Sequence, residues 1–119
     1  MPQQPTILFV DDEPVLRELL PLWLAQHGYR VLTASSGEEA LAILQKETVD
    51  VLLTDYNLPG ISGAQLIEQV PDKPSIVLYS DAADFPEAEK HRLKIREVLS
   101  KPIRREILLS ALKDITIQG

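Results

Sequence analysis

The chain has 119 residues, 45% of them hydrophobic and 25% charged, which suits one globular domain with a buried core. A net charge of -6 argues against general binding to nucleic acid, and the absence of cysteine excludes disulfides and thiolate metal sites. The longest apolar stretches have about five residues, far fewer than the roughly 20 that span a bilayer, and the N-terminus lacks the pattern of a signal peptide.

Apolar runs and segments of helical periodicity alternate from the start of the chain. Residues 6–10 form a continuous apolar run, which predicts a strand buried on both faces of a sheet. Pro14 then opens a segment with apolar residues at helical spacing, and Gly28 stands where such a helix would end. Residues 29–33 predict a second strand.

A capping-box pattern begins the next helix: Ser36 can cap it, and Glu39 can reach back three residues to the backbone. Residues 49–54 then predict a third strand, the most hydrophobic of the chain. The loop chemistry of residues 59–63 leads into a short helix predicted over residues 64–70.

The last part of the chain repeats the alternation with weaker signals. Residues 75–79 predict a fourth strand, and a highly charged helix is expected over residues 83–93, interrupted by Pro86. Residues 97–99 predict a short fifth strand, and Pro102 precedes a last helix with one apolar face.

Five strands alternating with five helices predict a parallel sheet covered by helices on both faces, with right-handed crossovers. The expected class is therefore a doubly wound α/β fold of the flavodoxin-like (βα)5 type, with five parallel strands in the order 2-1-3-4-5. We expect a single domain over residues 1–119, with a structured core from about residue 6 to about residue 115 and short tails.

Polar side chains stand where the predicted strands end. Asp11 and Asp12 follow the first strand, Asp55 ends the third, Ser80 ends the fourth and Lys101 follows the fifth. Because ligands of open parallel sheets bind outside the carboxyl ends of the strands, we expect these side chains to converge on one edge. Any one of them alone would more simply be a turn former or a helix cap.

Three carboxylates in one cleft repel one another, and a hard cation with oxygen ligands relieves that cost. Mg²⁺ typically binds one or two carboxylates and bridges to phosphate oxygens. A carboxylate such as Asp55 can act as a nucleophile and form an acyl phosphate. Lys101 could pair with Asp55 at rest and with a phosphoryl oxygen afterwards, while the Ser80 hydroxyl could donate to another.

These residues resemble the receiver domain of two-component response regulators over about residues 6–115. Residues 10–13 are similar to the family's acidic pair, and residues 55–63 are similar to its phosphoacceptor loop. Ser80 matches the Ser/Thr position of the family, and Lys101 with the proline after it matches a Lys-Pro step whose peptide bond is often cis.

The resemblance implies that Asp55 is phosphorylated and that Ser80 and Lys101 bind the phosphoryl group. It implies a Mg²⁺ or Mn²⁺ ion whose ligands are the carboxylates of Asp11, Asp12 and Asp55 and the backbone carbonyl of Asn57. Asp12 would be the main metal carboxylate, with Asp11 in support.

The resemblance also implies the partners. The phosphodonor would be a histidine kinase or a histidine phosphotransfer protein, and the state of the domain would be read by an output domain, a partner protein or a second copy. The chain would not be an enzyme beyond its own phosphorylation and dephosphorylation. We expect no direct contact with nucleic acid or membrane and a cytoplasmic location.

Three positions depart from the family pattern. Val98 stands where relatives commonly carry an aromatic residue that swings inward on activation, which a valine cannot do. Asp81 stands where relatives have a small residue, and it either adds negative charge to the site or, instead, points to solvent or caps the next helix. Residues 93–97 lack the usual Gly-Ala before the fifth strand.

Two other functions stay open at this point. A receiver-like module that signals without phosphate is favoured by Asp81 and Val98. A Mg²⁺-dependent phosphohydrolase that acts through Asp55 is disfavoured, since enzymes of the haloacid dehalogenase type usually need a second aspartate where this chain has Asn57.

Overall fold

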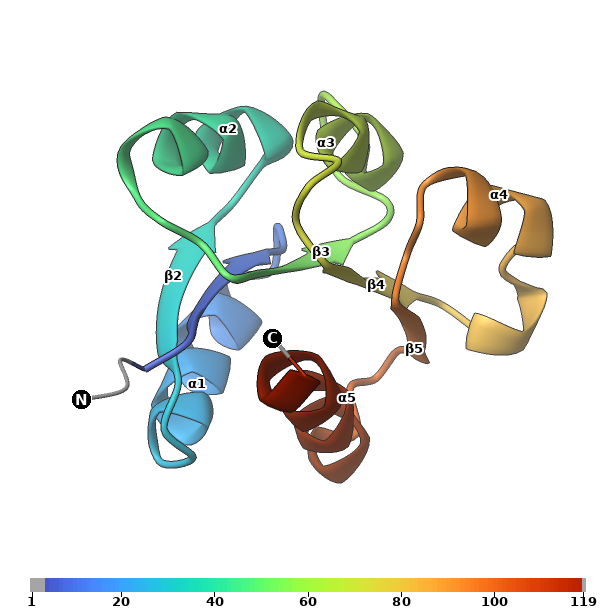
Figure 1. The fold of residues 1–119 in the computed structure, drawn as a ribbon. Helices are drawn as coiled ribbons and strands as arrows, with labels where there is room; N and C mark the ends of the chain where they lie inside the picture. Colours follow the sequence, from blue (N-terminus) through green and yellow to red (C-terminus); the bar gives the residue numbers. More distant parts are fainter. Residues whose placement is uncertain (1–3, 119) are drawn as a thin grey trace.

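The structure is a computed structural model that describes residues 4–118, with the backbone alone for Gln118. Its centre is a sheet of five parallel strands in the order β2-β1-β3-β4-β5, which confirms the predicted fold class and strand order (Figure 1). The strands are β1 (Thr6–Val10), β2 (Arg30–Ala34), β3 (Val51–Asp55), β4 (Ser75–Tyr79) and β5 (Glu97–Ser100).

Helices cover both faces of this sheet. They are α1 (Pro14–Ala25), α2 (Gly37–Lys46), α3 (Gly63–Gln69), α4 (Glu87–Arg92) and α5 (Arg105–Gln118), with a 3₁₀ turn η1 (Ala82–Asp84) before α4. Figure 1 shows α1 and α5 on one face of the sheet and α2 and α3 on the other, with α4 beyond β4. Within the described residues, none of these helices combines the length and the apolar composition that crossing a membrane requires.

Each face of the sheet has its own apolar core because successive residues of a strand point to opposite faces. In β1, Ile7 and Phe9 pack in the core under α1 and α5, whereas Leu8 and Val10 pack in the core under α2 and α3. All four side chains have no exposed surface. This double burial explains why β1 is a continuous apolar run instead of an alternating one.

β1 and β4 have the predicted bounds, and the bounds of the other three strands differ from the predicted ones by one or two residues. β2 begins at Arg30 because the Tyr29 N–H still donates to the Leu24 carbonyl, closing the end of α1 around Gly28. Gly28 has a φ of 89°, the left-handed conformation that glycine adopts at helix ends. β3 runs from Val51 to Asp55, so that Asp55 is its last residue.

The helix predicted over residues 83–93, interrupted by Pro86, forms as two short pieces. The chain forms the 3₁₀ turn η1 and then α4, with Pro86 as the residue that caps α4. Phe85 is extended, with φ of -70° and ψ of 129°, because the ring of a following proline disfavours the helical conformation. The proline therefore divides the segment and leaves α4 only six residues long.

Helix caps place two of the loops near the site. The Ser36 hydroxyl accepts a hydrogen bond from the Glu39 N–H, as predicted, but the Glu39 carboxylate accepts from the Ser35 N–H instead of from Ser36. A complete capping box that the sequence analysis did not identify lies at α3, where Ser62 and Gln65 each accept from the other's N–H. This box fixes where the loop after β3 enters α3.

Candidate phosphoacceptor and metal site

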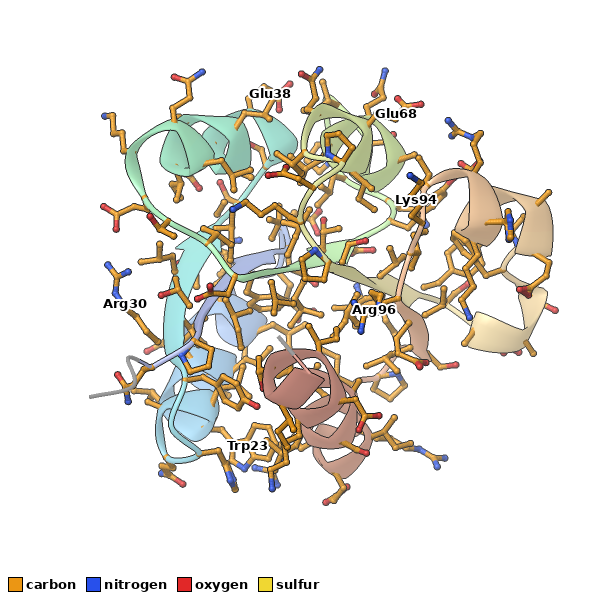
Figure 2. All side chains as sticks on the ribbon, in the orientation of Figure 1. Trp23, Arg30, Glu38, Glu68, Lys94 and Arg96 are labelled. Carbon is orange, nitrogen blue, oxygen red and sulfur yellow. The ribbon has the colours of Figure 1, made fainter. Side chains whose placement is uncertain are left out.

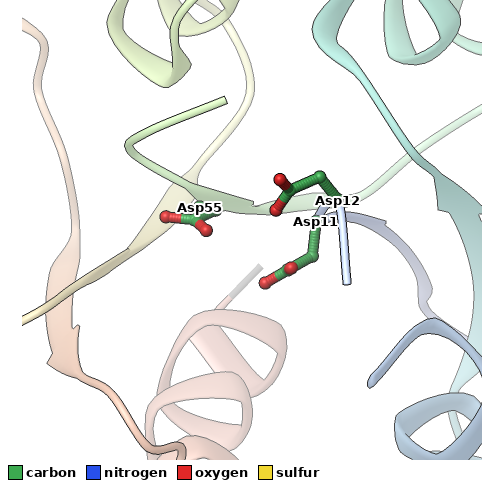
Figure 3. A group of neighbouring side chains, drawn as sticks. All are labelled: Asp11, Asp12 and Asp55. Atoms are coloured by element: carbon green, nitrogen blue, oxygen red, sulfur yellow. The ribbon is translucent and has the colours of Figure 1, made fainter. Parts of the chain in front are cut away.

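Three carboxylates meet at the carboxyl ends of β1 and β3. Asp11 and Asp12 directly follow β1, and Asp55 is the last residue of β3. One oxygen from each of the three lies within 4.8 Å of the others, and Figure 3 shows the three side chains at the ends of these two strands. Asp11 is fully buried and Asp55 is 5% exposed, whereas Asp12 is exposed and leaves the cluster open to solvent.

Lys101 supplies the positive charge that faces this cluster. Its Nζ donates a hydrogen bond of 2.8 Å to Asp55 Oδ2 and lies 3.6 Å from Asp11 Oδ2. Lys101 is held at this edge of the sheet because its backbone N–H donates to the Tyr79 carbonyl at the end of β4. The peptide bond between Lys101 and Pro102 is cis, as the resemblance implied.

The buried charges shift the pKa of two of these groups. Burial raises the pKa of the Asp11 carboxyl above its ordinary value, and the charges of Asp55 and Asp12 raise it further, against the opposing effects of the Glu13 N–H and Lys101. Burial alone lowers the pKa of the Lys101 ammonium, but its hydrogen bond to Asp55 and the negative charges of Asp11 and Asp55 raise it overall. The site therefore carries more negative charge than Lys101 neutralises.

The donor set fits a hard cation. Each buried aspartate uses one oxygen for a backbone donor: Asp11 Oδ1 accepts from the Glu13 N–H at 2.9 Å, and Asp55 Oδ1 accepts from the Asn57 N–H at 3.2 Å. Asp11 Oδ2 accepts no hydrogen bond from the described residues although it is buried. A buried carboxylate oxygen without a donor, beside two more carboxylates, is the arrangement that a Mg²⁺ ion would satisfy.

The loop after Asp55 is packed too closely for a side chain at Gly63. A Cβ atom there would lie 2.6 Å from the Asp55 carbonyl oxygen and 2.8 Å from Tyr56 Cα. The absence of a side chain lets the Gly63 N–H donate to the Tyr56 carbonyl, which brings the start of α3 against the end of β3. On the other side of the loop, the Ile61 N–H donates to the carboxylate of Glu38, which stands at the start of α2 (Figure 2).

The other predicted site residues lie on neighbouring segments. Ser80 follows β4 and is exposed, and no hydrogen bond joins its hydroxyl to the carboxylates in the part of the chain that the structure describes. Asn57 is exposed two residues after Asp55.

Two residues that depart from the family pattern lie beside the site. The Asp81 carboxylate accepts from the Ala83 N–H and caps η1, so the second of its two expected roles is the one observed. Val98 is half-buried in the core under α2 and α3.

The sequence analysis did not identify an aromatic cluster beside the site. The rings of Tyr56, Tyr79 and Phe85 meet edge to face, and the Tyr56 hydroxyl donates to Glu89 at 2.7 Å. These residues are spread over 34 positions, from 56 to 89, so no local motif joins them. The only signal was that aromatic residues directly follow Asp55 and directly precede Ser80.

Comparison with known proteins identifies the family. The family model of the response regulator receiver domain matches residues 7–113. The chain is 38% identical over 112 residues to the positive alginate biosynthesis regulatory protein of Pseudomonas aeruginosa, covering 90% of this chain and 45% of that protein. It is 30% identical to Protein PilH of the same organism, covering 92% of this chain and 95% of PilH.

Solved structures agree with the sequence relatives. The chemotaxis response regulator CheY4 of Vibrio cholerae matches with a TM-score of 0.87 and 29% identity, over 95% of this chain and 99% of CheY4. The response regulator TrrA of Thermotoga maritima, solved in complex with Mg²⁺ and BeF, matches with a TM-score of 0.81 and 30% identity, over 93% and 98% of the two chains.

The curated relatives differ in how much of their own length the matching segment makes up. The chain spans 45% of the alginate regulator and 26% of the Escherichia coli transcriptional regulatory protein GlrR. It also matches 12% of the sensor histidine kinase RcsC of Salmonella typhimurium, at 33% identity. Since the family model covers nearly the whole chain and PilH matches over almost its full length, this chain belongs to the response regulator receiver domains, the phosphoacceptor domains of two-component signalling.

Proposed function

We propose that Asp55 is the phosphoacceptor of this receiver domain and that its phosphorylation, with Mg²⁺ bound beside it, switches the domain's interactions with partners. The observation that supports this most directly is the contact of Lys101 Nζ with Asp55 Oδ2 inside a cluster of three carboxylates. Phosphoryl transfer needs chiefly positioning and charge neutralisation, and both are available at this edge of the sheet.

The metal ligands would be the carboxylates of Asp11, Asp12 and Asp55 and the backbone carbonyl of Asn57. A bound Mg²⁺ neutralises the charge that develops on the phosphoryl oxygens during transfer. Asp11 Oδ2 supports this assignment, because this buried oxygen accepts no hydrogen bond from the described residues and a cation would coordinate it. The same oxygen ligands suit Mn²⁺.

The reaction would use an Asp55 carboxylate oxygen as the nucleophile. That oxygen attacks the phosphorus of a phosphohistidine, the O–P bond forms, the N–P bond breaks, and the electron pair of that bond returns to the histidine ring nitrogen. Lys101 is already at hydrogen-bond distance from Asp55 and would move its hydrogen bond to a phosphoryl oxygen. The exposed Ser80 hydroxyl would donate to another.

The domain would also remove its own phosphoryl group. Attack of a water molecule on the phosphorus forms a new O–P bond, breaks the acyl phosphate O–P bond, releases inorganic phosphate and returns Asp55 as a free carboxylate. Such turnover is confined to the domain's own aspartate, so we do not assign it an external substrate.

The donor would be a histidine kinase or a histidine phosphotransfer protein, and α1 offers a surface for it. Val15, Leu19 and Leu22 lie on α1 and are 56%, 57% and 64% exposed. They begin three residues after Asp12, so a donor helix that packs on this stripe would bring its phosphohistidine towards the carboxylates. The state of the domain would then be read by an output domain, a partner protein or a second copy, and we expect this signalling in the cytoplasm.

The test is phosphorylation by a small-molecule phosphodonor. Incubation with Mg²⁺ and acetyl phosphate should add the mass of one phosphoryl group, and Asp55→Asn should abolish the gain. Asp72→Asn, a matched change at an exposed turn, should leave it intact. Unmodified protein under saturating Mg²⁺ and phosphodonor, or modification that persists in Asp55→Asn, would contradict the assignment.

The structure reduces the support for a module that signals without phosphate. That alternative drew on Asp81 as an extra negative charge at the site. The Asp81 carboxylate is instead engaged with the Ala83 N–H outside the carboxylate cluster, and Lys101 keeps its contact with Asp55.

A further inference from the structure

Three aromatic rings connect the two sides of the phosphoacceptor site. The Tyr56 ring meets the Tyr79 ring with centroids 5.6 Å apart at 81°, and both meet Phe85, at 5.0 Å and 5.1 Å. Tyr56 directly follows Asp55, and Tyr79 directly precedes Ser80. Two of the rings therefore belong to the chain neighbours of Asp55, which would carry the phosphoryl group, and of Ser80, which would donate to it.

The cluster continues to α4 through a hydrogen bond. The Tyr56 hydroxyl donates to Glu89 Oε2 at 2.7 Å, and the other oxygen of Glu89 accepts from Arg92 Nε at 2.9 Å. Arg92 Nη1 also binds the carboxylate of Glu68, which projects from α3, at 2.6 Å (Figure 2).

Helix α4 depends on such side-chain contacts because it buries none of its own residues. Its six residues follow Phe85 and Pro86 and end before the buried Leu93. By contrast, the Tyr56 backbone is held on both sides: its N–H donates to the Leu78 carbonyl and its carbonyl accepts from the Gly63 N–H. A change at the site is therefore transmitted more readily through the rings than through a shift of the β3 backbone.

We propose that Tyr56 and Glu89 couple the state of Asp55 to the position of α4. This inference rests on the proposed phosphorylation of Asp55. When a phosphoryl oxygen draws Ser80 towards the site, Tyr79 moves with it, the edge-to-face contacts with Tyr56 and Phe85 rearrange, and the hydrogen bond to Glu89 is broken or re-formed. Helix α4 then presents a different surface to a partner, and the coupling needs no aromatic residue at Val98.

The test is amide hydrogen exchange of α4, residues 87–92, with and without Mg²⁺ and beryllofluoride. In the wild-type chain, we expect the amide exchange rates of α4 to change several-fold when the site is loaded, that is, when it binds Mg²⁺ and beryllofluoride. Tyr56→Phe keeps the ring but removes the hydroxyl, and its α4 should lose more than half of that response while the site still loads. Tyr29→Phe is the matched control, since Tyr29 is buried and its hydroxyl lies 3.3 Å from Thr116 Oγ1, outside the cluster.

A second variant separates coupling from simple stabilisation. Glu89→Ala removes the acceptor and should reduce the α4 response as Tyr56→Phe does, with no further loss in the double variant. The inference is overturned if α4 responds in Tyr56→Phe as in the wild-type chain. It is equally overturned if Tyr56→Phe changes α4 exchange by the same factor in the loaded and unloaded states, or if α4 of the loaded wild-type chain does not respond.

Loading is read separately, by ¹⁹F NMR of the bound beryllofluoride. A wild-type chain that fails to load contradicts the proposed function itself, and the inference falls with it. A chain that loads without an α4 response contradicts the coupling alone.

Discussion

Replacing Lys101 by methionine should reveal how strongly the carboxylate cluster destabilises the fold when the Lys101 ammonium no longer neutralises it. The change keeps an unbranched apolar stem but leaves Asp55 and Asp11 without their ion-pair partner at 2.8 Å and 3.6 Å. Breaking a fully buried ion pair costs about 3–5 kcal/mol. Lys101 is 30% exposed and partly screened by water, so we expect a loss of about 2 kcal/mol in the free energy of unfolding.

The assay is chemical and thermal unfolding with EDTA and again with saturating Mg²⁺. With an unfolding entropy of about 2.1 cal/mol/K per residue, a loss of about 2 kcal/mol lowers the melting temperature of 119 residues by roughly 8 °C. Mg²⁺ should bind the variant more tightly than the wild-type chain, because no ammonium competes with it. Saturating Mg²⁺ should therefore close more than half of the difference in stability.

Two further variants make this prediction specific. The double variant Lys101→Met with Asp55→Asn should regain much of the loss, since the unpaired carboxylate is gone. Lys113→Met, an exposed lysine on α5, should change stability by less than about 0.5 kcal/mol. The reasoning is refuted if Lys101→Met is as stable as the wild-type chain in EDTA, or if Mg²⁺ leaves the difference unchanged.

Three other predictions follow from the structure. Gly63→Ala should destabilise the fold by about 1–3 kcal/mol and slow phosphorylation, because the new methyl group would meet the Asp55 carbonyl oxygen at 2.6 Å; unchanged unfolding and phosphorylation would contradict this. Leu19→Ser should leave stability and the rate with acetyl phosphate nearly unchanged but slow transfer from a phosphohistidine donor, and equal effects on both rates would exclude a donor surface on α1. Between pH 10 and 12, the wild-type chain should lose stability more steeply than Tyr56→Phe. The reason is that the Tyr56 phenol, whose pKa is raised to about 12 in the folded chain, keeps a proton that the unfolded chain has lost. Parallel pH profiles of unfolding, followed by circular dichroism, would refute this.

The fold could be predicted because its signals are local. The apolar run of β1, the cap at Ser36 and Gly28 at the end of α1 each act within a few residues, and each is observed where it was predicted. The α4 region was predicted less well. Pro86 divides it into η1 and α4, and its charged residues have no periodicity that would have fixed the ends of either piece.

Much of the site also followed from strand order. Asp11, Asp55 and Lys101 are far apart in the chain, but each lies at or directly after the end of a strand, and parallel strands place those ends on one edge. The residue types alone did not decide the role of Asp81. Its carboxylate accepts from the Ala83 N–H and caps η1, which only the path of the chain after β4 could show.

The amino-acid sequence by itself determined the order of strands and helices, the family and the set of carboxylates and lysine, because these depend on short-range patterns and on the topology that they allow. Only the tertiary structure decided that Asp11 keeps a buried oxygen without a donor and that Tyr56 reaches Glu89. Both depend on side-chain directions and distances of a few ångströms between segments that are distant in the chain, and such contacts are settled only when the two cores pack.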